Sequence, residues 1–301
     1  MHDYLLGIDL GGTNLKIVAV TPDGETLERV TAPTNDDGAA GFRGAVRREV
    51  EGVRQKHGQP AFVGLSAPGL ASRDARSITW MPGRLQGLEL FDWSEFLGYE
   101  TRICNDAQAA MAGEAWLGAA RGCENAFLLT LGTGVGGAIL LDGRVARGHI
   151  GRAGHLGHIC LDIDGVPDIV NTPGSIEDLF GDHSVNARSK GRFASTRELV
   201  AAAQGGDEDA KAVWARSIRA LACAIASLVN VLDPEKVVLG GGIALAGTAL
   251  FEPLRRELDA LEWRPGGHQI QIVATELDDF AGALGAAYLA YQGVKSNGET
   301  D

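Results

Sequence analysis

Two glycine-rich segments of the sequence have the composition of phosphate-binding turns. The second segment, residues 132–137, contains four glycines and a threonine. The first combines a carboxylate, two glycines and two side-chain donors: Asp9, Gly11, Gly12, Thr13 and Asn14. Glycine lacks a Cβ atom, so an anion can approach the backbone N–H groups of such a turn closely. A hairpin turn needs only one or two glycines, so a plain turn explains either segment equally well when it is taken alone.

Charged residues beside the first turn could act on a bound phosphate. Asp9 ends an apolar run and could hold a hydrated Mg²⁺ ion, which takes one or two carboxylates together with phosphate oxygens. Lys16 could face phosphate, although a solvated lysine on a strand is an equally good interpretation. A third glycine cluster, Gly240 to Gly242, follows an apolar run and could accept a ribose, a phosphate or an adenine edge. Neither the P-loop spacing nor the dinucleotide-binding fingerprint is present.

A third kind of chemistry is suggested by the segment GHLGHICLDIDGVPDIVNTPGSIED, residues 154–178. His155 and His158 lie three residues apart, and Cys160 and several carboxylates follow. These residue types could form a metal site, a sugar site or a surface loop, and the segment alone does not distinguish the three.

The elements that must position these residues alternate between strands and helices, which indicates an α/β fold. Strands are expected at 5–9, 15–20, 26–31, 61–65, 101–104, 126–131, 138–141, 236–239 and 270–274. Helices are expected at 40–56, 106–117, 207–232 and 282–291, with helix starts at Asp92 and Ser195. The segments LLGIDLGGTNLKIVAV and LLTLGTGVGGAILL are both a strand, a glycine turn and a strand. Two α/β lobes, each opening with a glycine hairpin, account for this repetition.

Composition excludes several classes of function. Of the 301 residues, 27 are Lys or Arg and 39 are Asp or Glu, which gives a net charge of −12. This charge argues against general binding of nucleic acid or of an anionic membrane. The four cysteines have no C-x-x-C spacing, which argues against a disulfide framework and a cysteine-built zinc site. No leader segment and no run of about 20 apolar residues is evident, so a cytoplasmic location is expected.

Six segments together resemble the ROK family of bacterial sugar kinases, a branch of the sugar-kinase, actin and Hsp70 superfamily. These segments are GIDLGGTNLKI, GLSAPGL, ICNDAQAA, LTLGTGVGGAILLDG, GHLGH and VVLGGGIALAG. The resemblance implies a ribonuclease H-like α/β fold with mixed sheets flanked by helices. It implies a smaller lobe of residues 1–117 with a C-terminal helix at about 282–295, a larger lobe of residues 118–281, and a cleft between them. It also implies that Mg²⁺ and ATP are bound.

The resemblance assigns the reaction to one carboxylate. In the family, the residues matched by Asn105 and Asp106 bind the sugar, and the aspartate is the general base for the attacking hydroxyl, usually the 6-hydroxyl of a hexose. Asp106 follows a short strand and opens a helix, so its carboxylate is expected near a positive helix terminus. An ordinary helix N-cap is the plain alternative.

The site residues expected on this basis fall into two sets. The expected sugar-binding residues are Gly69, Asn105, Asp106, His155, His158 and Glu177. The expected nucleotide-binding residues are Asp9, which would also orient Mg²⁺, with Gly11, Gly12, Thr13, Asn14, Lys16, Gly132, Thr133, Gly134, Gly136, Gly241 and Gly242.

This sequence departs from the family in the histidine segment. The resemblance places His155 where the family has a glutamate, and it places Asp168, Val170 and Ser175 where the family has three zinc-binding cysteines. A structural zinc ion is therefore not expected. Thr172 and Pro173 resemble an N-cap followed by proline, which predicts a helix that starts there and places Glu177 just beyond its first turn. We expect His155 to contact the sugar; a surface histidine without that role is the alternative.

Trp80 is a further departure, because the family often has an asparagine at that position. A tryptophan could stack on a sugar or pack within the smaller lobe, and packing is the favoured interpretation. The leading function is an ATP-dependent kinase for glucose or a close relative. The alternatives are a polyphosphate-dependent glucokinase, a sugar-responsive repressor and a sugar-sensing protein without activity. The family relationship also implies a homodimer or tetramer.

Overall fold

The computed structural model describes residues 3–298. The chain divides into two compact units. The first comprises Met1–Gly122, Gly143–Ala153 and Glu276–Asp301, and the second comprises Cys123–Asp142 and Gly154–Thr275. The sequence placed residues 143–153 in the larger lobe, whereas the structure groups them with the first unit. Hydrogen bonds account for this difference, because Arg147 donates to the carbonyl oxygen of Ser72 and Gln108 donates to that of Gly151.

The first unit contains a five-stranded sheet in the order β3-β2-β1-β4-β7. Its strands are β1 (Leu5–Leu10), β2 (Asn14–Val20), β3 (Thr26–Pro33), β4 (Phe62–Ala67) and β7 (Thr101–Asn105). The first three strands pair antiparallel, whereas β1, β4 and β7 run parallel. The carboxyl ends of these parallel strands therefore meet at one edge, where functional residues gather in open α/β sheets.

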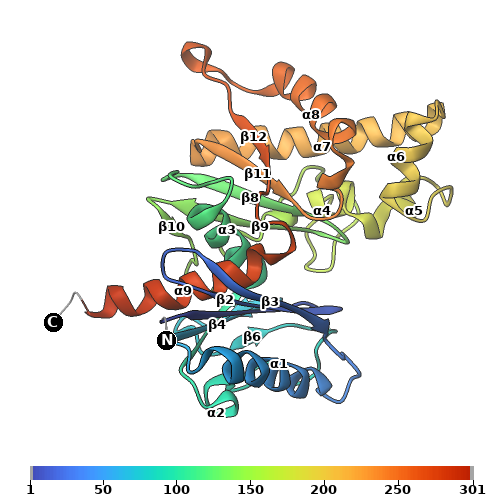
Figure 1. The fold of residues 1–301 in the computed structure, drawn as a ribbon. Coiled ribbons are helices and arrows are strands. Elements are labelled where there is room, and N and C mark those ends of the chain that lie inside the picture. The colour runs from blue at the N-terminus through green and yellow to red at the C-terminus, as the bar shows by residue number, and fades with distance from the viewer. Residues whose placement is uncertain (1–2, 299–301) are drawn as a thin grey trace. The chain divides into compact units, whose positions relative to one another are not determined.

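Helices cover both faces of this sheet (Figure 1). On one face, α1 (Gly41–His57) buries Phe42, Val46, Val50 and Val53, which recur at helical spacing. The other face is covered by α9 (Ala281–Gly298), which also packs on α3 (Asp106–Leu117).

Glycine allows α9 to approach the sheet at backbone distance. A Cβ atom on Gly7 or Gly64 would lie 1.9 Å from a carbonyl oxygen of α9, and one on Gly285 would lie 1.7 Å from the carbonyl oxygen of Ala109. A larger residue would force α9 away from the sheet at Gly7 or Gly64, and away from α3 at Gly285. Shorter elements complete the first unit: α2 (Trp93–Leu97), β5 (Leu70–Ala71), β6 (Ile78–Trp80), β10 (Arg144–Val145) and η5 (Asp278–Phe280).

The second unit contains strands in the order β9-β8-β11-β12. They are β8 (Ala126–Leu131), β9 (Val135–Leu141), β11 (Lys236–Gly240) and β12 (Gln271–Ala274). The first two form an antiparallel hairpin, and β8, β11 and β12 run parallel. The hairpins β1–β2 and β8–β9 confirm that the two glycine segments are the same structural device.

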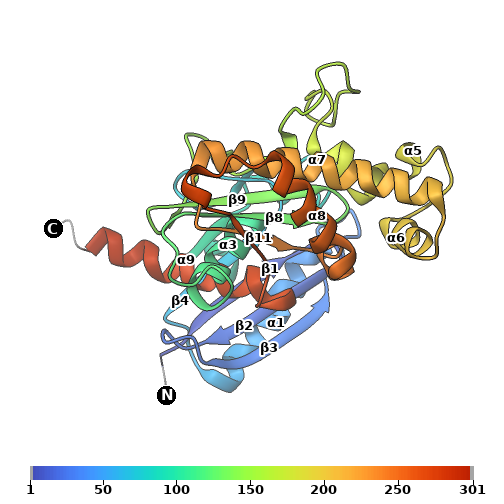
Figure 2. The ribbon, with the colours of Figure 1, turned by 90° about the horizontal axis from the view of Figure 1, so that it is seen from above.

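The core of the second unit lies between this sheet and its helices. The helices are α4 (Ile176–Phe180), α5 (Val185–Arg188), α6 (Thr196–Gln204), α7 (Glu208–Leu232) and α8 (Thr248–Leu261), with 3-10 turns η1 (Leu156–His158), η2 (Asp182–Ser184), η3 (Ala244–Ala246) and η4 (Pro265–Gly267). Figure 2 shows α7 running across the sheet. Leu221 and Ile225 of α7 are fully buried in one cluster with Phe127 and Leu129 of β8.

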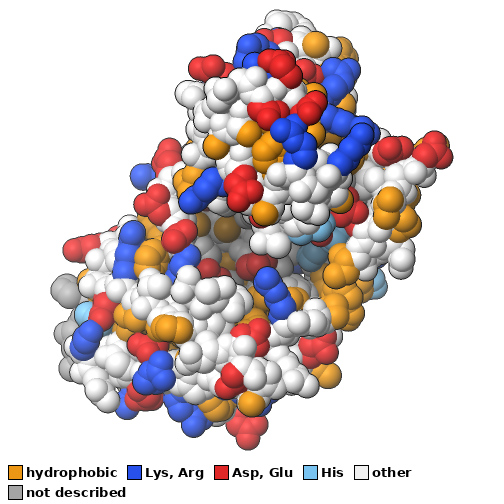
Figure 3. Space-filling view, turned by 90° about the vertical axis from the view of Figure 1, so that its right-hand side faces the viewer, with side chains coloured by type: hydrophobic (Ala, Val, Ile, Leu, Met, Phe, Trp, Pro, Cys, Tyr) orange, Lys and Arg blue, Asp and Glu red, His pale blue; other side chains and the backbone are white. Residues whose placement is uncertain are grey.

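The length and apolar composition of α7 would allow it to cross a membrane, although no such span was evident in the sequence. Half of its most apolar window is buried inside the protein, as expected for a core helix, and among the described residues it is the only helix with these properties. The sequence also placed the start of β9 at Ala138, whereas the strand begins at Val135, which pairs with Leu131. The second glycine turn is therefore short. On the face that Figure 3 shows, acidic and basic side chains are interspersed.

Candidate functional site

The edge of the first sheet brings two aspartates and a serine together. The hydroxyl of Ser66, the residue before the end of β4, donates to Oδ1 of Asp9 at 2.7 Å. Burial raises the pKa of Asp9 to about 6; the Ser66 hydrogen bond opposes this, and the charge of Asp106 adds to it. A Cβ atom on Gly282 would lie 2.8 Å from Cγ of Asp9, so glycine at the start of α9 makes room for the carboxyl group. The sequence did not indicate Ser66 or Gly282, because only tertiary pairing brings them to Asp9.

Asp106 is the exposed first residue of α3, and both of its neighbours in the chain are buried. Its Oδ1 accepts from the backbone N–H of Ala107 at 2.8 Å. The N-cap of α3 is Asn105, whose Oδ1 accepts from the N–H groups of Ala107 and Gln108. The plain alternative for Asp106, an ordinary N-cap, is therefore wrong, because Asn105 performs that task. The carboxylate of Asp106 lies at the positive end of the helix.

The side chain of Asn105 is also used to fix the loop after β4. Its Nδ2 donates to the carbonyl oxygen of Gly69 at 3.0 Å. Gly69 has φ 101°, and a Cβ atom there would lie 2.4 Å from the carbonyl oxygen of Trp80. Glycine is therefore needed at this position. This hydrogen bond ties the end of β7 to the loop after β4; Asn105 directly precedes Asp106 in the chain, and Gly69 lies against Trp80.

Trp80 lines a pocket of about 670 Å³ in the first unit, together with Asp36, Arg84 and Glu89. Trp80 is 49% exposed, so packing covers only about half of the residue. The guanidinium group of Arg84 lies 3.1 Å from the position that a Cβ atom on Gly12 would take. A cation thus lies beside the first glycine turn, and the sequence did not indicate it.

Two hydrogen bonds within the first unit fix the first glycine turn. Gly11 donates to the carbonyl oxygen of Asn14 at 3.1 Å, and Thr34 donates to that of Gly11 at 2.6 Å. Thr13 and Asn14 are exposed. Lys16 forms an ion pair with Asp279 at 3.4 Å.

A pocket of about 540 Å³ opens in the second unit beside the second glycine turn. Of the predicted nucleotide-binding residues, Gly132, Thr133 and Gly242 line it. Gly241 has φ 85° and lies against Leu131, where a Cβ atom would be 2.5 Å from the carbonyl oxygen. Gly136 is a strand residue of β9, paired with Thr130. The sequence missed the part of the lining formed by Ser195, Thr196 and Arg197 at the start of α6.

His158 is paired with a buried carboxylate. Its Nδ1 lies 2.8 Å from Oδ2 of Asp168, whose side chain is only 1% exposed. Asp168 Oδ1 accepts from the N–H groups of Val170 and Thr172, both at 2.9 Å. Burial raises the pKa of Asp168, but these hydrogen bonds outweigh it and hold the pKa below its usual value. His155 precedes η1 and is partly exposed.

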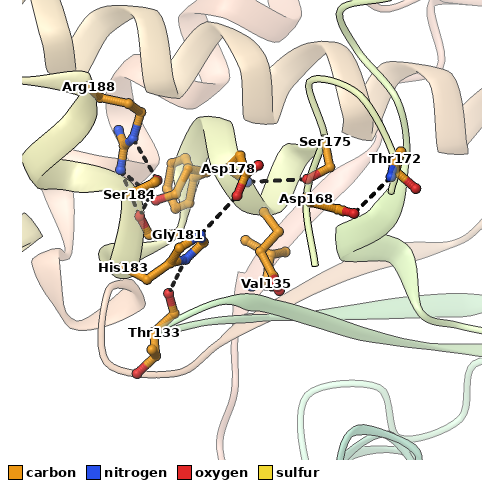
Figure 4. A network of polar contacts seen from close by, with 12 residues as sticks. Thr133, Val135, Asp168, Thr172, Ser175, Asp178, Gly181, His183, Ser184 and Arg188 are labelled. Carbon is orange, nitrogen blue, oxygen red and sulfur yellow. Dashed lines mark hydrogen bonds and ion pairs between the residues drawn. The ribbon is translucent and has the colours of Figure 1, made fainter. Parts of the chain in front are cut away.

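The predicted helix start at Thr172 is wrong. The helix α4 begins at Ile176, and its N-cap is Ser175, whose hydroxyl accepts from the N–H of Asp178. Thr172 is unavailable as a cap because it exchanges hydrogen bonds with Asp168 through both its N–H and its carbonyl oxygen. Figure 4 shows Asp168 and Thr172 near Ser175, the N-cap of α4. Glu177 consequently lies within the first turn of α4.

Glu177 contacts the second glycine turn. Its Oε2 accepts from the N–H of Val135 at 3.0 Å, and a Cβ atom on Gly134 would lie 2.4 Å from the same oxygen. Within residues 3–298, no group of three or more His, Cys, Asp or Glu side chains is arranged to hold a metal ion.

Comparisons with known proteins agree with this architecture. A family model described as "ROK family" matches residues 5–293. The chain is 31% identical to a glucokinase of Thermotoga maritima over 305 residues, covering 94% of this chain and 96% of the relative. It resembles a ROK hexokinase structure from Thermus thermophilus with a TM-score of 0.84 and 33% identity, covering 97% and 99% of the two chains. It also resembles a ROK family glucokinase of Streptomyces griseus, solved with glucose and AMPPNP, with a TM-score of 0.78 and 27% identity over 96% and 99% of the chains.

The family match covers nearly the whole described chain, and its structural relatives share the two-sheet α/β architecture of the sugar-kinase, actin and Hsp70 fold. The protein belongs to the ROK family.

Proposed function

We propose that this chain is a sugar kinase that transfers the γ-phosphate of ATP to a hydroxyl group, the 6-hydroxyl of glucose or of a closely related hexose. The observation that carries the proposal is the position of Asp106, an exposed carboxylate at the start of α3 between buried neighbours. The names of the T. maritima and S. griseus relatives support the reaction class.

Asp106 has the properties of a proton acceptor for the attacking hydroxyl. Phosphoryl transfer requires positioned reactants, stabilisation of charge and one group that takes the hydroxyl proton. Asn105 caps α3 and Gly69 fixes the adjacent loop, so the direction of the Asp106 side chain is set by rigid neighbours. The helix terminus favours the ionised form that accepts the proton.

Asp9 is suited to hold Mg²⁺ together with the phosphates of ATP. Burial and the Asp106 charge raise its pKa to about 6, so a nearby cation would favour its ionised form. Mg²⁺ takes oxygen ligands and one or two carboxylates, which fits this donor set. When bound, the ion neutralises charge on the phosphates.

The pocket of the second unit is the proposed nucleotide site. Its volume of about 540 Å³ is in the range of small-molecule sites. Apolar groups of Val200, Ile243 and Leu245 and polar groups of Thr133 and Ser195 line it. A base and a ribose need this mixture, and the amides of the glycine turn suit phosphates.

The sequence departure at His155 bears on which sugar is used. A carboxylate accepts two or more hydroxyl hydrogen bonds, whereas a neutral imidazole accepts one and donates one. If His155 contacts the sugar, His155→Ala raises the KM for the sugar and leaves the KM for ATP unchanged. An unchanged sugar KM would assign His155 to the surface.

The experiment is an assay of ADP release over hexoses, amino-hexoses and N-acetyl-hexosamines, with ATP or polyphosphate as donor. Asp106→Asn should lower kcat by roughly 10²–10⁴-fold, the contribution of a general base. Asp23→Asn is the matched control, because Asp23 is an exposed aspartate in the turn between β2 and β3.

Each outcome of the assay has a defined meaning. Turnover with polyphosphate but not with ATP would show that polyphosphate is the phosphate donor. Sugar binding without turnover would indicate a sugar sensor. Full activity of Asp106→Asn would remove the assignment of the base.

A further inference from the structure

The imidazole ring of His183, in η2, contacts two oxygen atoms of the second unit, one through each ring nitrogen. Its Nδ1 lies 2.9 Å from the carbonyl oxygen of Thr133, and its Nε2 lies 2.9 Å from Oδ1 of Asp178. The backbone N–H of His183 also donates to the carbonyl oxygen of Thr133 at 2.9 Å. Figure 4 shows the ring between Thr133 of the glycine turn and Asp178 of α4.

The chemistry of these two partners selects one protonation state. A carbonyl oxygen and a carboxylate oxygen only accept hydrogen bonds. Both contacts are hydrogen bonds at the same time only if both ring nitrogens carry hydrogen, as in an imidazolium. A neutral ring can satisfy only one of the two partners.

The charges around the ring agree with this state. Glu177 and Asp178 on α4 and Asp182 on η2 are acidic, and Arg188 on α5 and Arg197 on α6 are basic; the glycine turn carries no titratable group. Burial lowers the pKa of His183, but the hydrogen bonds to Thr133 and Asp178 outweigh it, and the pKa lies above its ordinary value. The side chain is 39% exposed, so it can exchange protons with solvent.

The backbone that carries His183 is itself fixed. Arg188 donates through Nη2 to the carbonyl oxygen of Gly181 at 2.8 Å and through Nε to the hydroxyl of Ser184 at 3.0 Å. Asp182 donates its N–H to the carbonyl oxygen of Gly132 at 3.0 Å. These hydrogen bonds fix the backbone of residues 181–184 and therefore the position from which the ring extends.

The anchored carbonyl groups determine where the amides of the turn point. Across a trans peptide bond the C=O and the N–H point in opposite directions. Asp182 and His183 hold the carbonyl groups of Gly132 and Thr133, so the N–H groups of Thr133 and Gly134 point away from the segment 181–184. Within the described part of the chain, neither N–H donates a hydrogen bond. Two such adjacent donors suit an anion.

We propose that His183, as an imidazolium, is a positioning residue that holds the Thr133 carbonyl and so presents the Gly134 N–H to the phosphate groups of the nucleotide. This rests on the proposed function. It predicts that the affinity for a triphosphate depends on the proton of His183, whereas the affinity for the sugar does not.

The test compares His183→Leu, Asp178→Asn and the parent chain for binding of AMPPNP by calorimetry across pH 6 to 9. His183→Leu should weaken AMPPNP binding roughly tenfold, the scale of one hydrogen bond to a charged group. In Asp178→Asn, the amide can donate to a neutral ring, so both contacts survive without the extra proton. AMPPNP affinity should therefore fall more steeply with rising pH in the parent than in Asp178→Asn, and the pH dependence of Asp178→Asn corrects for titration of the nucleotide itself.

Two further measurements separate the outcomes. The ¹⁵N shifts of the His183 ring report its charge without any ligand or turnover. His57→Gln is the matched control, because His57 pairs with Glu28 in the first unit. Equal AMPPNP affinity of His183→Leu and the parent at every pH, or a neutral His183 ring at pH 6, would overturn the inference. Absence of sugar phosphorylation with normal, His183-dependent AMPPNP binding would overturn the proposed function alone.

Discussion

Nδ1 of His158 lies 2.8 Å from Oδ2 of Asp168, a carboxylate that is almost completely buried. The pair joins the two sides of the loop between η1 and α4, and Asp168 also accepts from the N–H groups of Val170 and Thr172. The resemblance to the family places Asp168 where a cysteine would otherwise bind zinc. Hydrogen bonds to Asp168 thus hold together the part of the loop in which this resemblance would otherwise place a zinc ion.

Asp168→Ala should therefore destabilise this loop. Removing the carboxylate leaves two backbone N–H groups and a histidine without their acceptor, which we expect to cost about 2–4 kcal/mol. The measurement is hydrogen exchange of the amides of Val170 and Thr172 together with the urea midpoint. Asp164→Ala is the control, because Asp164 is exposed in the same loop. Equal exchange rates in the two variants would contradict this prediction.

The close approach of α9 to the first sheet gives a second prediction. Gly64→Ala places a methyl group 1.9 Å from the carbonyl oxygen of Ala286, so the helix or the strand must move. We expect a loss of about 1–3 kcal/mol or more, as for other overpacked cores.

A matched glycine gives the control for this substitution. Gly52 lies in α1 with no atom within 4 Å of an added Cβ atom, so Gly52→Ala should stabilise by about 0.5–1 kcal/mol. The urea midpoints of the two variants should move in opposite directions. A midpoint for Gly64→Ala at or above that of the parent would show that α9 does not hold this position in solution.

Glu177 and Gly134 provide a test of coupling between α4 and the glycine turn. A Cβ atom on Gly134 would lie 2.4 Å from Oε2 of Glu177, so Gly134→Ala should displace the carboxylate and break its hydrogen bond with Val135. The added methyl group should be tolerated better in a Glu177→Ala background. A double-mutant cycle on the urea midpoint should give a coupling of about 0.5–3 kcal/mol. Strict additivity would mean that the two residues do not meet.

Local patterns in the sequence predicted elements whose signals lie within a few residues. The start of α3 at Asp106 and the end of β8 at Leu131 follow from an apolar run that meets a polar or glycine boundary. The same reasoning failed at Thr172, because the pair Thr172-Pro173 satisfies the pattern of a helix start while Asp168 already binds both backbone groups of Thr172.

Tertiary contacts account for the remaining differences. Ser66 reaches Asp9 because β1 and β4 pair in register, and Arg84 reaches Gly12 across the fold of the first unit. The bridge from His183 to Thr133 spans 50 residues. No local spacing encodes such contacts, so the sequence indicated the two glycine turns but not the residues that hold them.

The raised pKa of Asp9 predicts that this carboxylate, which we propose holds Mg²⁺, lowers the stability of the folded protein at neutral pH. Its folded-state pKa of about 6 exceeds the usual value of 3.8, so between these pH values the folded protein binds more protons than the unfolded chain, and stability falls as the pH rises. At pH 7.5 the free energy of unfolding is lower by roughly 2–3 kcal/mol than at a pH where Asp9 is protonated in both states, since one pKa unit is about 1.4 kcal/mol. Asp9→Asn should therefore raise the thermal midpoint at pH 7.5 in the presence of a chelator. The gain should shrink to about a third at pH 4.5, where the carboxyl group is largely protonated when folded. The control Asp23→Asn, at an exposed position, should show neither effect. A stabilisation of Asp9→Asn that is the same at both pH values would mean that charge burial at this residue is not its cause.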